Sequence, residues 1–219
     1  LTDADYNVAI GYEALDADLK GNRAIAIGHA ALGTQSFSTS TDSYNVAVGF
    51  QAGTSVTTGT NNVLVGGLAG DALTDADANV AIGKSALSAD TMGSKSIAIG
   101  LGALQSQNFS TATDAHNTAV GHGVGASVTT GIRNTFIGSE AGDAITTGQD
   151  NVAVGALALS ADQKGNFSVA VGRGALKTQS FSTASNTYNI GIGYSAGELL
   201  TVGFQNVLIG GLAPRPIAI

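Results

Sequence analysis

A five-residue motif ending in glycine recurs twelve times in this chain of 219 residues, and this repeat constrains the fold more than any other feature. It reads NVAIG at residues 7–11 and continues, with variants such as AIAIG and NTFIG, to NVLIG at residues 206–210. The closing glycines lie at positions 11, 28, 49, 66 and 83, so three 17-residue units and one 21-residue unit make a 72-residue block, which runs three times. Such a period predicts stacked structural repeats.

The blocks cover residues 1–72, 73–144 and 145–216, so we expect one repetitive segment over residues 1–219. Leu1, Leu73 and Ile145 open equivalent blocks, and Ile217 begins a fourth. Because the pattern continues at both ends, the sequence is interpreted as an excerpt of a longer fibrous protein.

Each motif places β-branched residues at alternate positions, which is typical of a strand. A 17-residue unit is too short for a strand–helix–strand crossover, which needs about 30 residues. In turns such as Lys20-Gly21-Asn22 and Thr57-Thr58-Gly59 we expect glycine to supply positive φ. The prediction is an all-β parallel β-solenoid of about twelve coils, which at roughly 4.8 Å per coil spans about 55–60 Å.

The two faces of the repeated strand differ in side-chain size. Val8 and Ile10 share one face and Ala9 lies on the other, because strand side chains alternate. We expect the Val and Ile face to line the interior, beside a ladder of stacked asparagine amides. The ladder would contain Asn7, Asn45, Asn62, Asn79, Asn117, Asn134, Asn151, Asn189 and Asn206.

The opposite face is non-polar in every coil, although a strand position facing water normally carries polar residues. This pattern predicts contact with another closely packed surface, so Ala98→Glu is expected to break assembly. The predicted contact face contains Ala9, Ala26, Ala47, Leu64, Ala81, Ala98, Ala119, Phe136, Ala153, Ala170, Gly191 and Leu208.

Composition excludes several classes of protein. The chain has no cysteine, hence no disulfide framework and no thiolate site. Nine basic residues and a net charge of −7 give no cationic surface, so we expect no nucleic-acid binding. No apolar stretch approaches the roughly 18–20 residues of a membrane span, and we expect no membrane insertion.

The three 21-residue units carry a similar insertion, at residues 33–44, 104–116 and 177–188. Each places phenylalanine among serine and threonine, two positions after a glutamine. An aromatic ring beside hydroxyl groups can stack on a sugar, so these loops are candidate surface contacts. The alternative is that each phenylalanine folds back onto the local core. The candidate residues are Gln35, Phe37, Gln107, Phe109, Gln179 and Phe181.

Other polar residues have structural interpretations. The pairs Asp3/Asp5, Asp16/Asp18 and Asp75/Asp77 suit calcium, but we interpret them as turn residues at a solvated edge. His29 and His122 lie five coils apart, about 24 Å, and do not share an ion within one chain. His116 is expected to pack. We identify no catalytic, cofactor-binding or metal-binding residues and expect that the protein is not an enzyme.

Several stretches resemble a known family of repeats: NVAIGYEAL at 7–15, VTTGTNNVLVGGLAG at 56–70, NTFIGSEAG at 134–142 and ITTGQDNVAVG at 145–155. They are similar to the trimeric β-roll repeats of phage tail fibres, which are related to the YadA-like head repeats of trimeric autotransporter adhesins. The resemblance covers essentially the whole chain. It implies a left-handed parallel β-roll assembled as a parallel homotrimer, with the alanine face between the chains.

The resemblance also implies a function. The expected role is a structural and adhesive segment of a phage tail fibre that reaches toward the host surface and helps to bind a host glycan or protein. The alternatives are the head of a bacterial surface adhesin, a polysaccharide-degrading solenoid and an ice-binding solenoid. Adhesin heads usually have shorter units and no counterpart of the 21-residue units, which favours the phage fibre. The expected location is the virion tail fibre or the cell surface.

Overall fold

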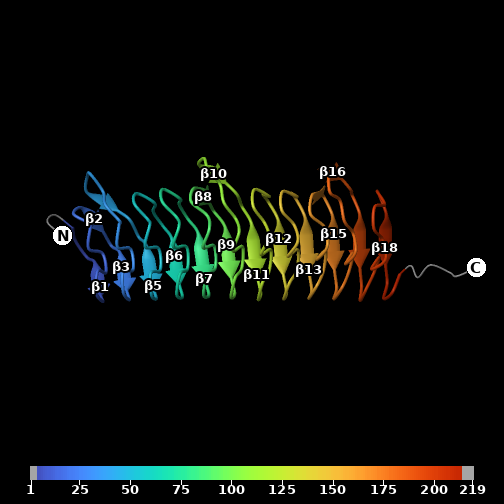
Figure 1. Ribbon diagram of the computed structural model, residues 1–219, viewed down its shortest axis with the longest axis horizontal. Helices are drawn as coiled ribbons and strands as arrows, with labels where there is room; N and C mark the ends of the chain where they lie inside the picture. The colour runs from blue at the N-terminus through green and yellow to red at the C-terminus, as the bar shows by residue number, and fades with distance from the viewer. Residues whose placement is uncertain (1–3, 214–219) are drawn as a thin grey trace, which may run out of the picture.

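The computed structural model describes residues 4–213, which form a rod of stacked coils (Figure 1). One parallel sheet runs the length of the rod, and each coil contributes one three-residue strand to it. Its strands are β1 (Val8–Ile10), β3 (Ile25–Ile27), β5 (Val46–Val48), β6 (Val63–Val65), β7 (Val80–Ile82), β9 (Ile97–Ile99), β11 (Thr118–Val120), β12 (Thr135–Ile137), β13 (Val152–Val154), β15 (Val169–Val171), β17 (Ile190–Ile192) and β18 (Val207–Ile209). Residues 4–213 contain no helix, so the predicted all-β parallel solenoid is confirmed.

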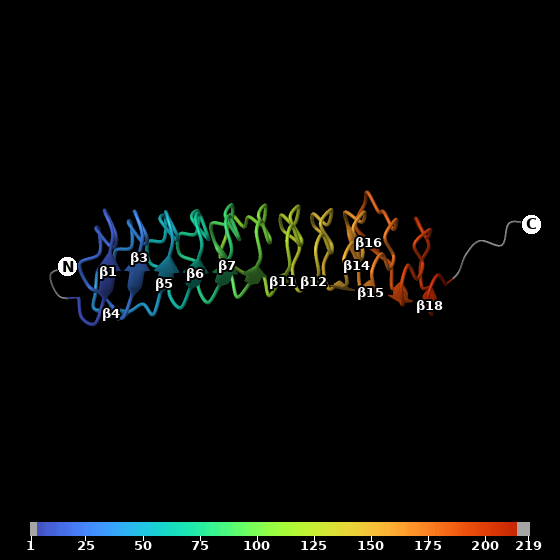
Figure 2. The ribbon, with the colours of Figure 1, turned by 90° about the horizontal axis from the view of Figure 1, so that it is seen from below.

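The 21-residue coils keep the same register as the shorter ones. Val8 pairs with Ile25 and Ile25 pairs with Val46, although a 17-residue coil makes the first step and a 21-residue coil makes the second. The extra residues form protruding loops, each with a small parallel pair of strands: β2 (Gly21–Asn22) with β4 (Thr41–Asp42), β8 (Gly93–Ser94) with β10 (Thr113–Asp114), and β14 (Gly165–Asn166) with β16 (Ser185–Asn186). Figure 2 shows the coils from below, still stacked side by side.

The predicted asparagine ladder is confirmed, and it joins the coils at the start of nine of the twelve strands, while Ala24, Ser96 and Ser168 take its position before β3, β9 and β15. Asn62 Nδ2 donates to the carbonyl of Ala76 in its own coil at 2.8 Å. Asn62 Oδ1 accepts from the backbone N–H of Asn79 in the next coil at 3.0 Å. Each amide therefore closes one coil and fixes the start of the next, which satisfies backbone groups that would otherwise be buried without partners.

The orientation of the strand faces is opposite to the prediction. Ala26, Ala98 and Ala153 are 0% exposed within the single chain and belong to its own core, whereas the Val and Ile side chains point outward and are half-buried or exposed. The same holds for the predicted contact residues Ala47, Leu64, Ala81, Ala119, Phe136, Ala170 and Gly191, which are all buried. Ala9 in β1 is exposed and Leu208 in β18 is half-buried, because each of these strands has a paired neighbour on one side.

The narrow interior of a 17-residue coil explains this orientation. Six coils place a leucine opposite the strand, as Leu104 does, and an alanine on the strand leaves room for it. Where the strand carries a large residue, the opposite positions are glycine. A Cβ on Gly53 would lie 2.5 Å from Leu64 Cδ1, and a Cβ on Gly70 would lie 2.7 Å from Leu64 Cδ2. Large and small side chains thus compensate across the core, which keeps it close-packed.

Glycine is required at the end of each strand for two reasons. Gly100 has a φ of +136°, a conformation that side chains with a Cβ rarely adopt, and its backbone lies against the next coil. A Cβ there would lie only 2.1 Å from the carbonyl oxygen of Gly121. The equivalent glycines repeat this contact along the rod, so close approach of successive coils depends on them.

Gly100→Ala is expected to lower the free energy of unfolding by about 3–5 kcal/mol, because it adds both backbone strain and a clash with the next coil. Gly67→Ala is the matched control. Its Cβ would meet no atom closer than 4.0 Å, so a change within about 0.5 kcal/mol is expected. Urea unfolding followed by circular dichroism measures both, and equal destabilisation by the two variants would contradict the proposed role of Gly100.

The turn glycines do not have the predicted conformation. Gly21 and Gly59 do not have a positive φ. Non-glycine residues of the same turns do, such as Arg23 (+61°) and Asn61 (+59°). Glycine is needed at these turns for space instead. A Cβ on Gly21 would lie 2.1 Å from Asp18 Oδ2, and one on Gly59 would lie 2.4 Å from the carbonyl oxygen of Ala76.

Candidate functional site

Three buried polar networks, one in each block, join consecutive coils. In the central network Asp90 Oδ2 accepts a hydrogen bond of 2.6 Å from Gln107 Nε2, and Gln107 Oε1 accepts one of 2.8 Å from Asn117 Nδ2. Asp90 Oδ1 accepts from the backbone N–H groups of Gly93 and Phe109, at 3.0 and 3.1 Å. The equivalent networks are Asp18–Gln35–Asn45 and Asp162–Gln179–Asn189.

These networks interrupt an otherwise apolar column inside the solenoid. Val56 and Leu73 occupy this column in the two coils before Asp90, and Val128 and Ile145 occupy it after Gln107. A buried carboxylate is tolerated here because all its hydrogen bonds are satisfied. The networks therefore act in packing, and their side chains are not accessible to a ligand.

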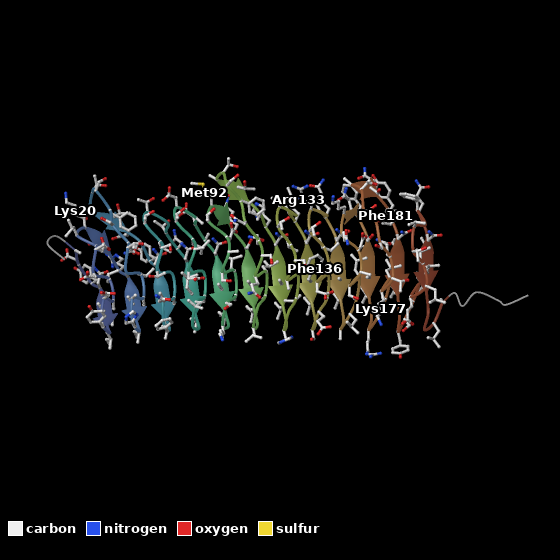
Figure 3. The ribbon with its side chains drawn as sticks, in the orientation of Figure 1. Lys20, Met92, Arg133, Phe136, Lys177 and Phe181 are labelled. Carbon is white, nitrogen blue, oxygen red and sulfur yellow. The ribbon has the colours of Figure 1, made fainter. Side chains whose placement is uncertain are left out.

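The predicted loop contacts are consequently wrong. Gln35, Gln107 and Gln179 are fully buried, and Phe37, Phe109 and Phe181 are also buried, so the alternative of a phenylalanine folded onto the core is the observed one. In Figure 3, Phe181 lies toward the upper part of the rod, whereas Phe136 lies lower, at the level of the strands. At the tips of these loops, residues 38–40, 110–112 and 182–184, the exposed residues are small and mostly hydroxylic: Ser38, Thr39, Ser40, Ser110, Thr111, Ala112, Ser182, Thr183 and Ala184.

The largest uniform surface is the outward face of the twelve-stranded sheet. It contains two outward positions per strand, and 22 of these 24 positions hold valine or isoleucine. Four isoleucines between the end coils, at positions 82, 97, 137 and 192, keep 37–41% of their surface exposed. Soluble monomers rarely expose a continuous apolar surface along a whole sheet, so this face is a candidate interaction surface. We call it the aliphatic face.

Aromatic residues flank the aliphatic face in the first coils. Tyr12, His29 and Phe50 stack in a row, with ring centroids 5.5 and 5.3 Å apart. Arg23 lies over the ring of Tyr6 at 4.9 Å on the other flank. Tyr12 is 72% and Phe50 56% exposed, but their ring faces are partly covered by His29 between them. The row therefore presents ring edges more than open stacking platforms.

The remaining polar candidates do not form a metal site. No group of three or more His, Cys, Asp or Glu residues able to hold a metal ion occurs within residues 4–213. Asp18 is buried rather than at a solvated edge, and Asp3 lies outside the described residues. His116 is exposed, although packing was expected, and His122 is exposed as well.

Two aspartates have a carboxylate oxygen without a hydrogen-bond partner among the described residues. Asp71 Oδ1 and Asp143 Oδ1 are buried and unpartnered, at equivalent positions of the first and second blocks. Burial raises the pKa of both carboxyl groups, because an apolar environment disfavours the charged form. For Asp143 the charge of Glu140 raises the pKa further.

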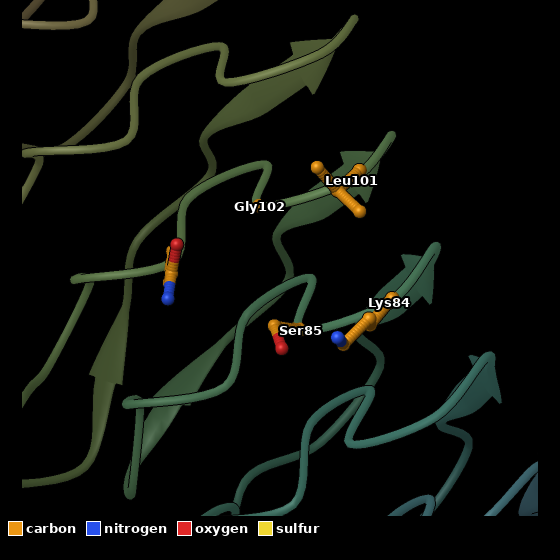
Figure 4. A pocket seen from close by; sticks show the side chains of 5 residues that line it. Lys84, Ser85, Leu101 and Gly102 are labelled. Atoms are coloured by element: carbon orange, nitrogen blue, oxygen red, sulfur yellow. The ribbon is translucent and has the colours of Figure 1, made fainter.

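The surface also contains a shallow hollow between two neighbouring coils. It is lined by Lys84, Ser85, Leu101, Gly102 and Gln105, and has a volume of about 200 Å³ (Figure 4). None of its lining residues is a carboxylate, and the equivalent positions of the third block carry Ala156, Leu157, Arg173, Gly174 and Lys177. The hollow is thus a local feature of one block.

Comparisons with family models, curated proteins and solved structures gave no match to this chain. Within residues 4–213 no helix is long and apolar enough to cross a membrane.

Proposed function

We propose that this chain is a structural and adhesive segment of a trimeric phage tail fibre, which extends toward the host surface and helps to attach to it. The observation that carries the proposal is the aliphatic face, which runs along the whole described rod without a partner in the chain. A rod with such a surface needs a second rod-shaped surface of the same spacing, and further copies of this chain provide one.

The aliphatic face replaces the alanine face as the proposed trimer interface. The alanine side chains already pack inside their own chain, so they do not reach a partner. The aliphatic side chains repeat at each coil, about 4.8 Å apart, and a parallel copy presents the same repeat. The trimeric state itself comes from the resemblance to fibre repeats.

The proposed mechanical role rests on the backbone. Parallel pairing is continuous from β1 to β18, with the glycine and asparagine ladders beside it. Each coil is held by its two neighbours, which gives a stiff, quasi-one-dimensional element that transmits force along its length. This suits a segment whose task is to hold a binding element away from the particle.

We assign the proposed contact with the host surface to the tips of the 21-residue coils. The tips stand out along the upper edge of the rod in Figure 1, near β10 and β16, and repeat every four coils, about 19 Å. Their serine and threonine hydroxyls donate and accept hydrogen bonds, which suits contact with the hydroxyl groups of a surface glycan. Several weak contacts on one rigid rod add avidity.

The second candidate, the head of a bacterial trimeric adhesin, shares the NVAIG motif and would use the same rod and the same interface. The 21-residue coils favour the fibre, because adhesin head repeats have no counterpart of them. A polysaccharide-degrading solenoid is the third candidate. It is tested by incubating the assembled protein with host polysaccharide and measuring the release of reducing ends.

Ile97→Glu tests the assembly. Its side chain points outward and is 38% exposed, so the variant is expected to keep its β-structure while losing the trimer. Native mass spectrometry is expected to give three times the 21.6 kDa chain mass for the parent and the single-chain mass for the variant. A charge at the centre of an apolar interface is costly because it is removed from water.

Ser106→Glu is the matched control, since it places the same charge on an exposed turn outside the aliphatic face. It is expected to remain trimeric. If the parent protein has the mass of a single chain, the proposed assembly is contradicted. If the Ile97→Glu variant is still a trimer, the aliphatic face is not its interface.

A further inference from the structure

Two threonines interrupt the aliphatic face at one place. Thr118 in β11 and Thr135 in β12 point outward, are half-buried, and pair directly with each other in the sheet register. The other 22 outward positions of the sheet are valine or isoleucine. Within residues 4–213 neither hydroxyl group makes a side-chain hydrogen bond, so both remain available to an external partner.

The threonine pair also breaks the 72-residue repeat. The residues equivalent to Thr118 are Val46 and Ile190, and those equivalent to Thr135 are Val63 and Val207. The other outward positions of the sheet hold valine or isoleucine in every block, and the 21-residue loops return after every four coils. Within the coils that overlap, the aliphatic face alone therefore discriminates weakly between chains in register and chains displaced by one block.

We propose that Thr118 and Thr135 fix the register of the chains in the assembly by forming one shared polar layer. This inference rests on the proposed trimer. In register, the threonines of all three chains meet at the same level, and each hydroxyl finds a donor or acceptor on a neighbouring chain. After a shift, the hydroxyls face valine or isoleucine and stay unsatisfied in an apolar interface, which disfavours the shifted arrangement. A single buried polar position sets register in coiled coils by the same principle.

Disulfide trapping tests this role, since the chain has no cysteine of its own. One chain carries Val48→Cys and the other Val120→Cys, which are outward positions four coils apart. The two chains are mixed unfolded, refolded together and oxidised. A shift of four coils brings the two introduced thiols next to each other, whereas in register they lie about 19 Å apart along the rod. That separation exceeds the roughly 7 Å limit between the Cα atoms of a disulfide.

With both threonines present, we expect links between identical positions and almost none between 48 and 120. In the isosteric background Thr118→Val/Thr135→Val, the 48–120 link is expected to rise at least about fivefold. The valine background keeps the coil shape, and circular dichroism checks that each chain is folded.

The sharper arm of the experiment moves the threonine pair by one block. A Val120→Cys parent chain is mixed with a Val48→Cys chain that also carries Val46→Thr/Val63→Thr and Thr118→Val/Thr135→Val. In assemblies that contain both chains, alignment of the threonines requires the shift of four coils, so the 48–120 link is expected to rise well above its level in the mixture whose threonine pairs are unmoved.

The outcomes separate the two proposals. If native mass spectrometry of the parent protein gives the mass of a single chain, both the trimer and the register role are contradicted. If the protein is a trimer but forms no disulfide between two copies of the Val48→Cys chain, the aliphatic face is not its interface. A trimer with 48–48 links in which the 48–120 link fails to rise in the valine background, or stays rare when the pair is moved, overturns the register role and leaves the proposed function intact.

Discussion

Ala98→Glu is expected to unfold the coils around β9 and to lower the free energy of unfolding by more than about 4 kcal/mol, because it forces a charged side chain into a core position that is 0% exposed. The neighbouring residue, Ile97, lies on the opposite face of the same strand. Ile97→Glu introduces the same charge one residue away and is expected to leave the β-structure of the chain in place. Far-ultraviolet circular dichroism and urea unfolding of both variants at low protein concentration measure the difference.

The pair of variants decides between two orientations of the strand. If the alanine face lay between chains, Ala98→Glu would give folded single chains and Ile97→Glu would disrupt the core, which is the reverse of the expected result. From the sequence alone Ala98→Glu is expected to break assembly only, and the structure makes this expectation wrong, because Ala98 belongs to the core of its own chain.

Asp90→Leu is expected to lower the free energy of unfolding by about 3–5 kcal/mol, since it removes the acceptor for three buried donors. These donors are Gln107 Nε2 and the backbone N–H groups of Gly93 and Phe109. None of them gains a new partner from leucine. The midpoint of urea unfolding measures the loss.

The double variant Asp90→Leu/Gln107→Val is the matched control, because Val56 and Leu73 already fill the same column with apolar side chains. It is expected to be more stable than Asp90→Leu alone. It removes the glutamine amide, whose Nε2 group has lost one of its two acceptors and keeps only Ser96 Oγ at 3.2 Å. Asn117 Nδ2 keeps its hydrogen bond of 2.7 Å to the carbonyl of Gly131. A single variant as stable as the parent, or a double variant less stable than the single one, would show that the network does not hold the coils together.

The repeat made the coil, the strand and the asparagine ladder predictable. A 17-residue or 21-residue period leaves room for one strand and its turns, and the asparagine represented by Asn62 recurs at the start of coil after coil because the same backbone groups must be satisfied each time. Stacking of equivalent residues then follows from the period itself.

Alternation along the strand shows that Val8 and Ile10 share a face, but it does not show which of the two faces is buried. The inner face could therefore not be predicted from alternation. A second pattern in the sequence contains this information. Strands that carry a large inner residue, such as Leu64 and Phe136, lie beside coils with glycine at the position where other coils have leucine. Compensation of this kind requires the two positions to face each other inside the coil.

The sequence also contains a pattern from which the buried networks could have been predicted. Asp18, Asp90 and Asp162 occupy the same position in the three 72-residue blocks, and each is followed one coil later by a glutamine. The coils that carry these glutamines begin with alanine or serine in place of asparagine, which leaves space for the longer amide. The predicted surface role of these glutamines rested on loop composition and did not use their spacing from the preceding aspartate.

The constant strand register through the three 21-residue coils has an evolutionary consequence. Because every block begins and ends with the same cross-section, unequal recombination between blocks adds or removes four coils, about 19 Å of rod, at a join where each ladder continues unbroken. The length of such a rod can therefore change in discrete increments by copy number alone, while the architecture of each coil is inherited unaltered.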